Sequence, residues 1–187
     1  PWVHNVRNTD MICAVDDAQC LDLLRLFNEE TGHEVLTRAG VPEPVVDDLH
    51  LLGISSICNL VAAIDTAKYY DMDGRDIIFT PLTDSAAMYN SRLREMTAAR
   101  GSYGRDQAVA DHARWLLGAT PDYVRELSYH DRKTLHNFKY FTWVEQQGRS
   151  VEELRQLWDR DFWTETFAVA DAWDRRIEEV NGRVGLI

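Results

Sequence analysis

The sequence predicts an α/β domain followed by an all-helical extension. Two short apolar runs of strand length lie in the first 100 residues, and each precedes a segment whose apolar residues recur at helical spacing. Beyond residue 103 only the helical pattern continues. With 187 residues, 45% of them apolar, the chain can bury a substantial core. We place the boundary at Gly101–Ser102, which gives an α/β portion at 1–100 and an extension at 101–187.

The first half of the α/β portion reads as a strand and two helices. Residues 11–15 form an apolar run of strand length, and the Asp pair at 16–17 offers an N-cap for a helix. The Thr-Gly pair at 31–32 indicates the end of that helix. A second helix is expected after Gly53, because one apolar stripe continues over residues 57–67.

The second half adds a strand and a helix before the extension begins. Residues 76–80 have the β-branched and aromatic composition of a buried parallel strand. A third helix follows, with Asp84 or Ser85 at its start, and a capping box opens at Ser150 in the extension. The extension is expected to form helices at residues 105–118, 130–147, 150–159 and 161–181.

Charge and composition exclude several classes of function. Twenty basic against 31 acidic residues give a net charge of −11, which repels nucleic acid and acidic membranes. No apolar run approaches the roughly 18 residues of a membrane helix, and the start resembles no secretory signal. We therefore expect a cytoplasmic protein. The three cysteines, Cys13, Cys20 and Cys58, lack metal-site spacing and are interpreted as reduced core residues.

The first residue is also informative, because a primary translation product begins with Met. Pro1 instead indicates a processed product, one half of a split protein or a shortened chain, and composition does not choose among these.

The best candidate for chemistry is the turn between the expected strand 76–80 and the third helix. It carries three consecutive polar side chains, Thr83, Asp84 and Ser85. Ligands of open α/β sheets gather at the carboxyl ends of strands, where helix N-termini supply free N–H groups. Simple N-capping explains the same residue types, so spacing alone leaves both interpretations open.

Two segments resemble one family in the right order. Residues 53–63, GISSICNLVAA, resemble the GISSG helix start of cysteine synthases, which are fold type II pyridoxal-phosphate enzymes. Residues 76–89, DIIFTPLTDSAAMY, resemble that family's late strand and turn, where Pro-Ser-Ser or Pro-Asp-Ser precedes a Tyr four residues on. The resemblance covers roughly residues 1–100 and implies the C-terminal part of the family's sheet with its flanking helices. The helical tail looks like that of a bacterial subgroup.

The resemblance implies that the Ser85 hydroxyl bonds the pyridine nitrogen of the cofactor, with Thr83 and Asp84 beside it. A neutral hydroxyl does not stabilise a protonated ring, which favours β-elimination or β-replacement on an amino acid. The sequence departs from the pattern because Pro81 is displaced and Ile57 replaces the second Gly of GISSG. Asp84 is a rival ring partner that would favour a protonated cofactor.

Two parts of such an enzyme are missing from the sequence. The family's Schiff-base lysine and its Gly-rich phosphate loop precede the segment that matches Pro1, and Lys68, Lys133 and Lys139 lie outside the family's context. The resemblance therefore implies no catalytic residue on this chain and an N-terminal subunit or fragment as partner. The alternative is a non-catalytic binding or regulatory partner derived from the same fold.

Other polar and aromatic groups carry weaker indications. His4, Asn5 and Arg7 are candidates for the substrate side of the site, although a solvated terminal segment explains them equally well. His130 and His136 do not share a helix face, so no metal site is expected. The apolar stripe from Trp163 to Val180 is either tail core or an interface for further oligomerisation.

Overall fold

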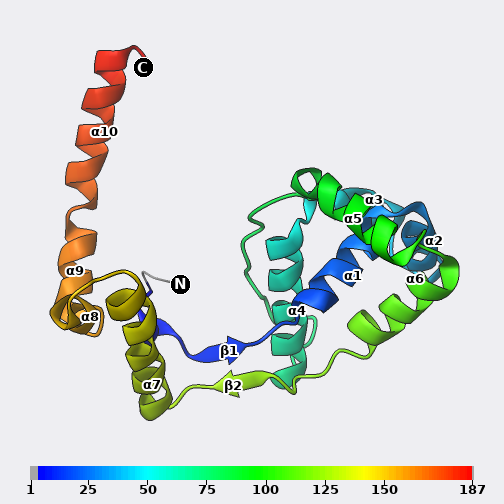
Figure 1. The fold of residues 1–187 in the computed structure, drawn as a ribbon, viewed down its shortest axis with the longest axis horizontal. Coiled ribbons are helices and arrows are strands. Elements are labelled where there is room, and N and C mark those ends of the chain that lie inside the picture. Colours follow the sequence, from blue (N-terminus) through cyan, green and yellow to red (C-terminus); the bar gives the residue numbers. More distant parts are fainter. Residues whose placement is uncertain (1–3, 187) are drawn as a thin grey trace. The chain divides into compact units, whose positions relative to one another are not determined.

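A computed structural model describes residues 4–186, so Pro1 lies outside the described residues. The chain is mostly helical (68%) with one small sheet, in which β1 (Met11–Cys13) pairs with β2 (Val124–Glu126) (Figure 1). The fold is thus a mixture of helices and sheet. It divides into a large unit, residues 12–125, and a small unit, described residues 4–11 with 126–186. Each unit is described by itself.

Six α-helices and several short turns build the large unit. The helices are α1 (Asp17–Asn28), α2 (Glu30–Arg38), α3 (Glu43–Asp48), α4 (Ile54–Tyr69), α5 (Asn90–Arg100) and α6 (Arg105–His112). The short turns are 3-10 helices at Leu49–Leu51 and Ala86–Tyr89 and a π-helical turn at Ala113–Leu117.

The core of the large unit lies among α1, α2, α4 and α6. Leu23, Leu24 and Leu26 of α1 are completely buried, as is Ile57 of α4. These positions follow the apolar stripes of the sequence, and Asp16 caps α1 by accepting a hydrogen bond from the Ala18 N–H (2.8 Å). The predictions of a helix after residues 16–17 and of another after Gly53 are confirmed.

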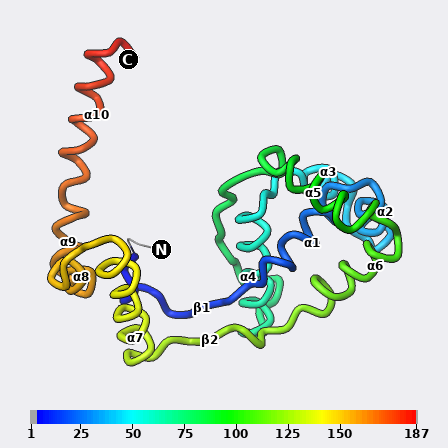
Figure 2. The backbone as a smooth tube through the Cα atoms, viewed as in Figure 1, coloured from blue at the N-terminus to red at the C-terminus, as the bar shows by residue number. Residues whose placement is uncertain are grey.

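The predicted strand at residues 76–80 is wrong for this chain. The segment is extended loop between α4 and α5 (Figure 2), and the side chains of Ile77 and Phe79 are 89% and 96% exposed. Among the described residues, the backbone N–H groups of residues 77–80 donate to no acceptor. A strand requires a neighbouring strand to complete its hydrogen bonds, and none lies beside this segment.

The predicted helix end at residues 31–32 is also wrong, because α2 runs through both. Helix α1 stops instead at Glu29, which is extended, and α2 starts at the next residue. Gly32 has a packing role: a Cβ atom there would lie 2.1 Å from the Leu26 carbonyl oxygen. The glycine that resembled a stop signal lets two helices approach closely.

The two units do not follow the division expected at Gly101–Ser102. Tyr103 and Ala108 are buried in the core of the large unit, so the first turns of the extension belong with α1 and α2. No pattern in the sequence predicted β2. Its three residues, near the end of the large unit, pair with β1 near the start of that unit.

The small unit contains a 3-10 turn (Val6–Asn8), α7 (Tyr129–Tyr140), a π-helical turn (Phe141–Gln146), α8 (Val151–Gln156), α9 (Arg160–Ala168) and α10 (Ala170–Val184). Its buried apolar residues are Val6, Leu127, Leu154 and Leu157. The capping box predicted at Ser150 is present, since Ser150 and Glu153 each accept a hydrogen bond from the other's backbone N–H.

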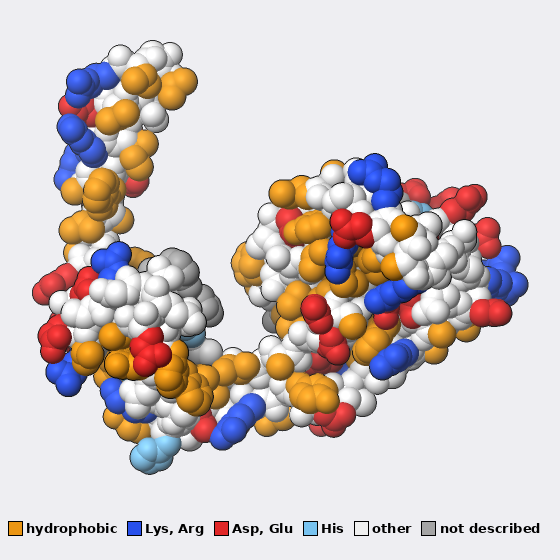
Figure 3. Space-filling model, viewed as in Figure 1, with side chains coloured by type: hydrophobic (Ala, Val, Ile, Leu, Met, Phe, Trp, Pro, Cys, Tyr) orange, Lys and Arg blue, Asp and Glu red, His pale blue; other side chains and the backbone are white. Residues whose placement is uncertain are grey.

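Helices α9 and α10 contain no buried residue. The single helix expected at 161–181 is broken at Val169. Along α10, Trp173, Ile177, Val180 and Val184 are all exposed, and Figure 3 shows the apolar side chains on this helix. None of the helices in the described chain combines the length and the apolar character that crossing a membrane demands.

Candidate functional site

The two segments that carry the family resemblance meet in the large unit. The Gly53 N–H donates to the Asp84 carbonyl (3.0 Å), and the Thr83 N–H donates to the Ser56 hydroxyl (3.0 Å). A Cβ atom at Gly53 would lie 2.5 Å from the Asp84 carboxyl carbon, so a larger residue there would displace the Asp84 carboxylate. The start of α4 and the turn at 83–85 therefore form one packed structure.

The Asp84 carboxylate caps α4 from across this contact. It accepts hydrogen bonds from the Ser56 N–H (3.2 Å), from the Ser56 hydroxyl (3.1 Å) and from the Tyr89 hydroxyl. Burial alone would raise the pKa of Asp84, but these hydrogen bonds outweigh it and hold the pKa below its usual value. A carboxylate with these partners stabilises the fold and is not free to bind a ligand.

Ser85 is in a different situation from its two neighbours. It is half-buried at the start of the short Ala86–Tyr89 turn, and its hydroxyl makes no hydrogen bond within residues 4–186. The Thr83 hydroxyl, in contrast, donates to Asp84 (3.3 Å). Of the three candidate cofactor residues, Ser85 alone keeps a free hydroxyl for a ligand.

All three lysine ammonium groups already have contacts. Lys68 Nζ donates to the Ala119 carbonyl (2.5 Å), and Lys139 Nζ donates to the His4 carbonyl (2.5 Å). Lys133 Nζ lies over the Trp158 ring, 4.2 Å from its centroid. Within the large unit, which also contains Ser85, Lys68 contacts residues 117–119.

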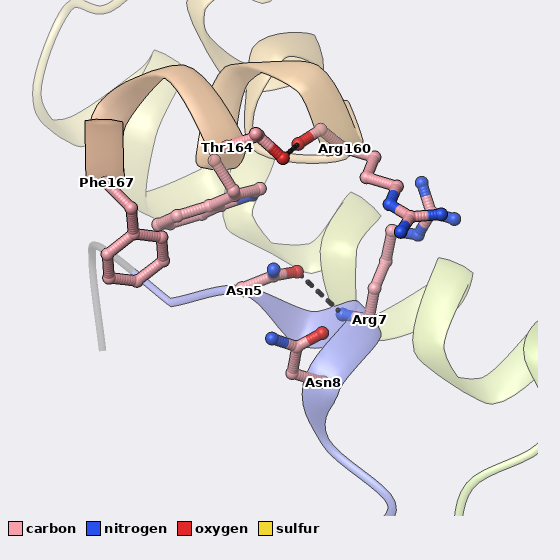
Figure 4. Close-up of a pocket in the computed structure, with 7 residues that line it drawn as sticks. Asn5, Arg7, Asn8, Arg160, Thr164 and Phe167 are labelled. Carbon is pink, nitrogen blue, oxygen red and sulfur yellow. Dashed lines mark hydrogen bonds between the residues drawn. The ribbon is translucent and has the colours of Figure 1, made fainter.

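The candidate substrate residues lie in the small unit. The Asn5 side chain accepts a hydrogen bond from the Arg7 N–H (3.1 Å), and Arg7 Nη1 donates to the Trp158 carbonyl (3.2 Å). Asn5 and Arg7 line a pocket of about 400 Å³ together with Asn8, Arg160, Trp163, Thr164 and Phe167 (Figure 4). His4 is outside the lining, and its ring bonds the Thr9 hydroxyl (2.6 Å).

The sequence reasoning missed the four α9 residues of this pocket. Arg160, Trp163, Thr164 and Phe167 follow the 3, 1, 3 spacing of one helix face, which was the available signal. These residues face residues 5–8, which lie some 150 positions away in the sequence. Local sequence patterns cannot predict such a long-range contact.

Helix α7 carries a basic cluster of which two members, His136 and Lys139, are buried. His136 is 3% exposed, and its Nδ1 atom has no hydrogen-bond partner among the described residues. Burial, followed by the positive charges of Lys133 and Lys139, lowers the pKa of His136 to about 4. Burial also lowers the pKa of Lys139. His136 is therefore neutral in the folded protein at pH 7.

We expect the small unit to lose stability between pH 7 and pH 5 because of His136. The unfolded-state pKa of histidine is near 6.5. The unfolded state therefore takes up a proton in this range while the folded state does not, and the free energy of unfolding falls by about 2 kcal/mol. Urea denaturation at the two pH values measures the loss.

His136→Gln should remove this part of the pH dependence, because glutamine does not titrate. His130→Gln, at an exposed position of the same helix, should leave the loss unchanged. Equal pH dependence in all three proteins would contradict the assignment to His136.

The cysteines are all free, with Cys20 buried and Cys13 and Cys58 half-buried. Burial is the main cause that raises the pKa of Cys13 to about 11 and that of Cys20 to about 12, which makes both thiols poor nucleophiles at neutral pH. In the part of the chain that the structure describes, no group of three or more His, Cys, Asp or Glu residues is placed to hold a metal ion.

No family model, curated protein or solved structure matches this chain.

Proposed function

We propose that this chain is the C-terminal part of a fold type II pyridoxal-phosphate enzyme of the cysteine synthase type. It acts on an amino acid by β-elimination or β-replacement, and an N-terminal partner chain supplies the Schiff-base lysine and the phosphate loop. The observation that carries the proposal is the contact between the start of α4 and the turn at 83–85, which leaves the Ser85 hydroxyl free. Both segments are the ones that resemble the family.

The residues of this chain fit the pyridine ring of the cofactor, but they provide neither its Schiff-base lysine nor its phosphate loop. The free Ser85 hydroxyl can donate to a pyridine nitrogen, while the Asp84 carboxylate is held by Ser56 and Tyr89. This favours Ser85 over Asp84 as the ring partner. The three lysines are engaged elsewhere, and the ten glycines form no phosphate loop. The cofactor would supply the electron sink for carbanion chemistry, and Ser85 would keep its nitrogen unprotonated.

The exposed segment 76–80 supports the need for a partner chain. The backbone N–H groups of residues 77–80 find no acceptor in the part of the chain that the structure describes, and apolar side chains lie on both faces of the extended segment. A strand of a parallel sheet is buried on both faces and pairs on both sides. A sheet edge of the N-terminal partner is the occupant that satisfies the backbone and the side chains together.

The colour and reactivity of the assembled protein distinguish the proposed enzyme from a non-catalytic binding or regulatory partner. Tagged full-length chain, isolated with its partner and supplied with pyridoxal phosphate, should show a visible absorption band that changes when an amino acid is added. Borohydride trapping should attach the cofactor to a lysine of the partner and to none of Lys68, Lys133 and Lys139. A colourless complex would favour the binding or regulatory role.

Ser85→Ala should leave the fold intact and weaken cofactor binding about tenfold, since one hydrogen bond to the ring is lost. Turnover should fall with it, and Ser85→Asp should change the visible spectra of the reacting enzyme by favouring a protonated ring. Cofactor titration and spectra of the complex measure both effects. Asp84→Asn is the comparison: if it alters the cofactor spectrum and both Ser85 variants do not, Asp84 is the ring partner.

A further inference from the structure

The pocket of the small unit gathers positive charge on a strongly acidic chain. Arg7 and Arg160 both line it, and no Asp or Glu does. Figure 4 shows both arginine side chains at the same edge of the pocket. Neither forms an ion pair within the described residues, although the chain carries 31 acidic side chains. Adjacent like charges repel each other, and a bound anion would relieve that repulsion.

One of these two arginines is held in place and the other is free. Arg7 Nη1 donates to the Trp158 carbonyl (3.2 Å), and its guanidinium stacks over the Trp158 ring (5.7 Å). The Arg160 side chain makes no hydrogen bond within residues 4–186. The remaining N–H groups of Arg7 and all those of Arg160 are therefore available to an anion.

The rest of the lining adds amide donors and an apolar wall. The side-chain Oδ1 of Asn5 accepts from the Arg7 N–H, so the side-chain N–H groups of Asn5 are left to donate. Trp163 and Phe167 are one helical turn apart on α9, and the indole N–H of Trp163 bonds the Leu157 carbonyl (3.0 Å), which fixes the ring. Figure 4 shows the Phe167 ring on the side of the pocket opposite to the two arginines.

We propose that this pocket binds an organic phosphate monoester with a flat apolar body. Two guanidinium forks and the amide groups offer more donors than the two oxygens of a carboxylate can accept, and a phosphate dianion presents three oxygens. A zwitterionic amino acid is a poor match, because no lining carboxylate would receive its ammonium group. The proposal does not depend on the proposed enzyme activity, and its test needs neither cofactor nor partner chain.

Isothermal titration of the full chain with five small probes tests the proposal. Phenyl phosphate should bind most tightly, inorganic phosphate and benzoate each about tenfold or more weakly, and phenylalanine and phenol not measurably. Benzoate or phenylalanine binding as tightly as phenyl phosphate would overturn the phosphate assignment, and so would equal binding of phenyl phosphate and phenol.

Matched substitutions locate the binding. Arg160→Gln should weaken phenyl phosphate binding about tenfold without changing thermal stability, because its guanidinium has no hydrogen bond or ion pair to lose among the described residues. Arg175→Gln, which removes an exposed and unpaired charge from α10, should leave the affinity unchanged. Phe167→Ala should weaken phenyl phosphate and leave inorganic phosphate unaffected. Equal losses from Arg160→Gln and Arg175→Gln would reduce the binding to overall charge and contradict the site.

Discussion

Replacing Phe79 by lysine is expected to abolish assembly with the partner chain and to leave the stability of the large unit unchanged. The Phe79 side chain is 96% exposed, so the isolated chain loses no contact. In a sheet edge buried on both faces, the lysine would have to lose its hydration without a partner charge, which costs several kcal/mol. Size-exclusion chromatography of the mixed chains measures assembly, and a denaturant titration of the single chain measures stability.

Val45→Lys is the matched control, because Val45 is 50% exposed on α3 in the same unit. It introduces the same charge at an apolar surface position away from residues 76–80, and the complex should form as in the wild type. Normal assembly of the Phe79→Lys chain would show that the segment pairs with nothing, and it would remove the structural support for a partner sheet.

Replacing Asp84 by alanine should lower the free energy of unfolding of the large unit by about 2–3 kcal/mol. The substitution removes the cap of α4 and leaves the completely buried Ser56 hydroxyl with one fewer hydrogen-bond partner. It also removes a negative charge from the N-terminal end of that helix, where the helix dipole favours it. Urea denaturation followed by circular dichroism measures the loss.

Asp48→Ala supplies the comparison for this loss. Asp48 is an exposed acid in the same unit with no hydrogen bond or ion pair among the described residues, so its removal should change the stability by no more than about 0.5 kcal/mol. If Asp84→Ala lowers the free energy of unfolding no more than Asp48→Ala does, the Asp84 carboxylate does not stabilise the fold. It would then be available as a ligand for the proposed cofactor ring.

Local patterns predicted the helices of the core well. The stripes that end in Phe27 and begin at Ile57 are long and regular, and both became buried helix faces. Gly32 shows the limit of such patterns, since its role depends on the approach of Leu26 and not on its neighbours in sequence. The break at Val169 had no marker at all, because neither glycine nor proline interrupts the helical pattern there.

The run at 76–80 shows what strand propensity can and cannot establish. Ile77, Ile78 and Phe79 are residues that favour strands, and the chain is indeed extended there. Propensity carries no information on which chain supplies the hydrogen bonds, so the burial predicted from composition was wrong for this chain alone.

The candidate site was only partly predictable for a related reason. The sequence identified Asp84 as a cap, but for the helix that follows it, whereas the carboxylate caps α4, which starts 30 residues earlier. The free hydroxyl of Ser85 is a consequence of that arrangement. The arginine pair of the small unit joins residues 7 and 160, and no local pattern could have related them.

The residues that flank the exposed run affect how the chain behaves while this segment is uncovered. Arg75 and Asp76 precede the apolar residues and Pro81 follows them, so the proline-free stretch at 77–80 is only four residues long. Segments that nucleate aggregation are about five to seven residues of this composition, and charges or proline at their ends oppose stacking between copies. The chain can therefore stay unaggregated after synthesis while this extended apolar segment is exposed. Replacing Pro81 or Asp76 should promote aggregation and precipitation.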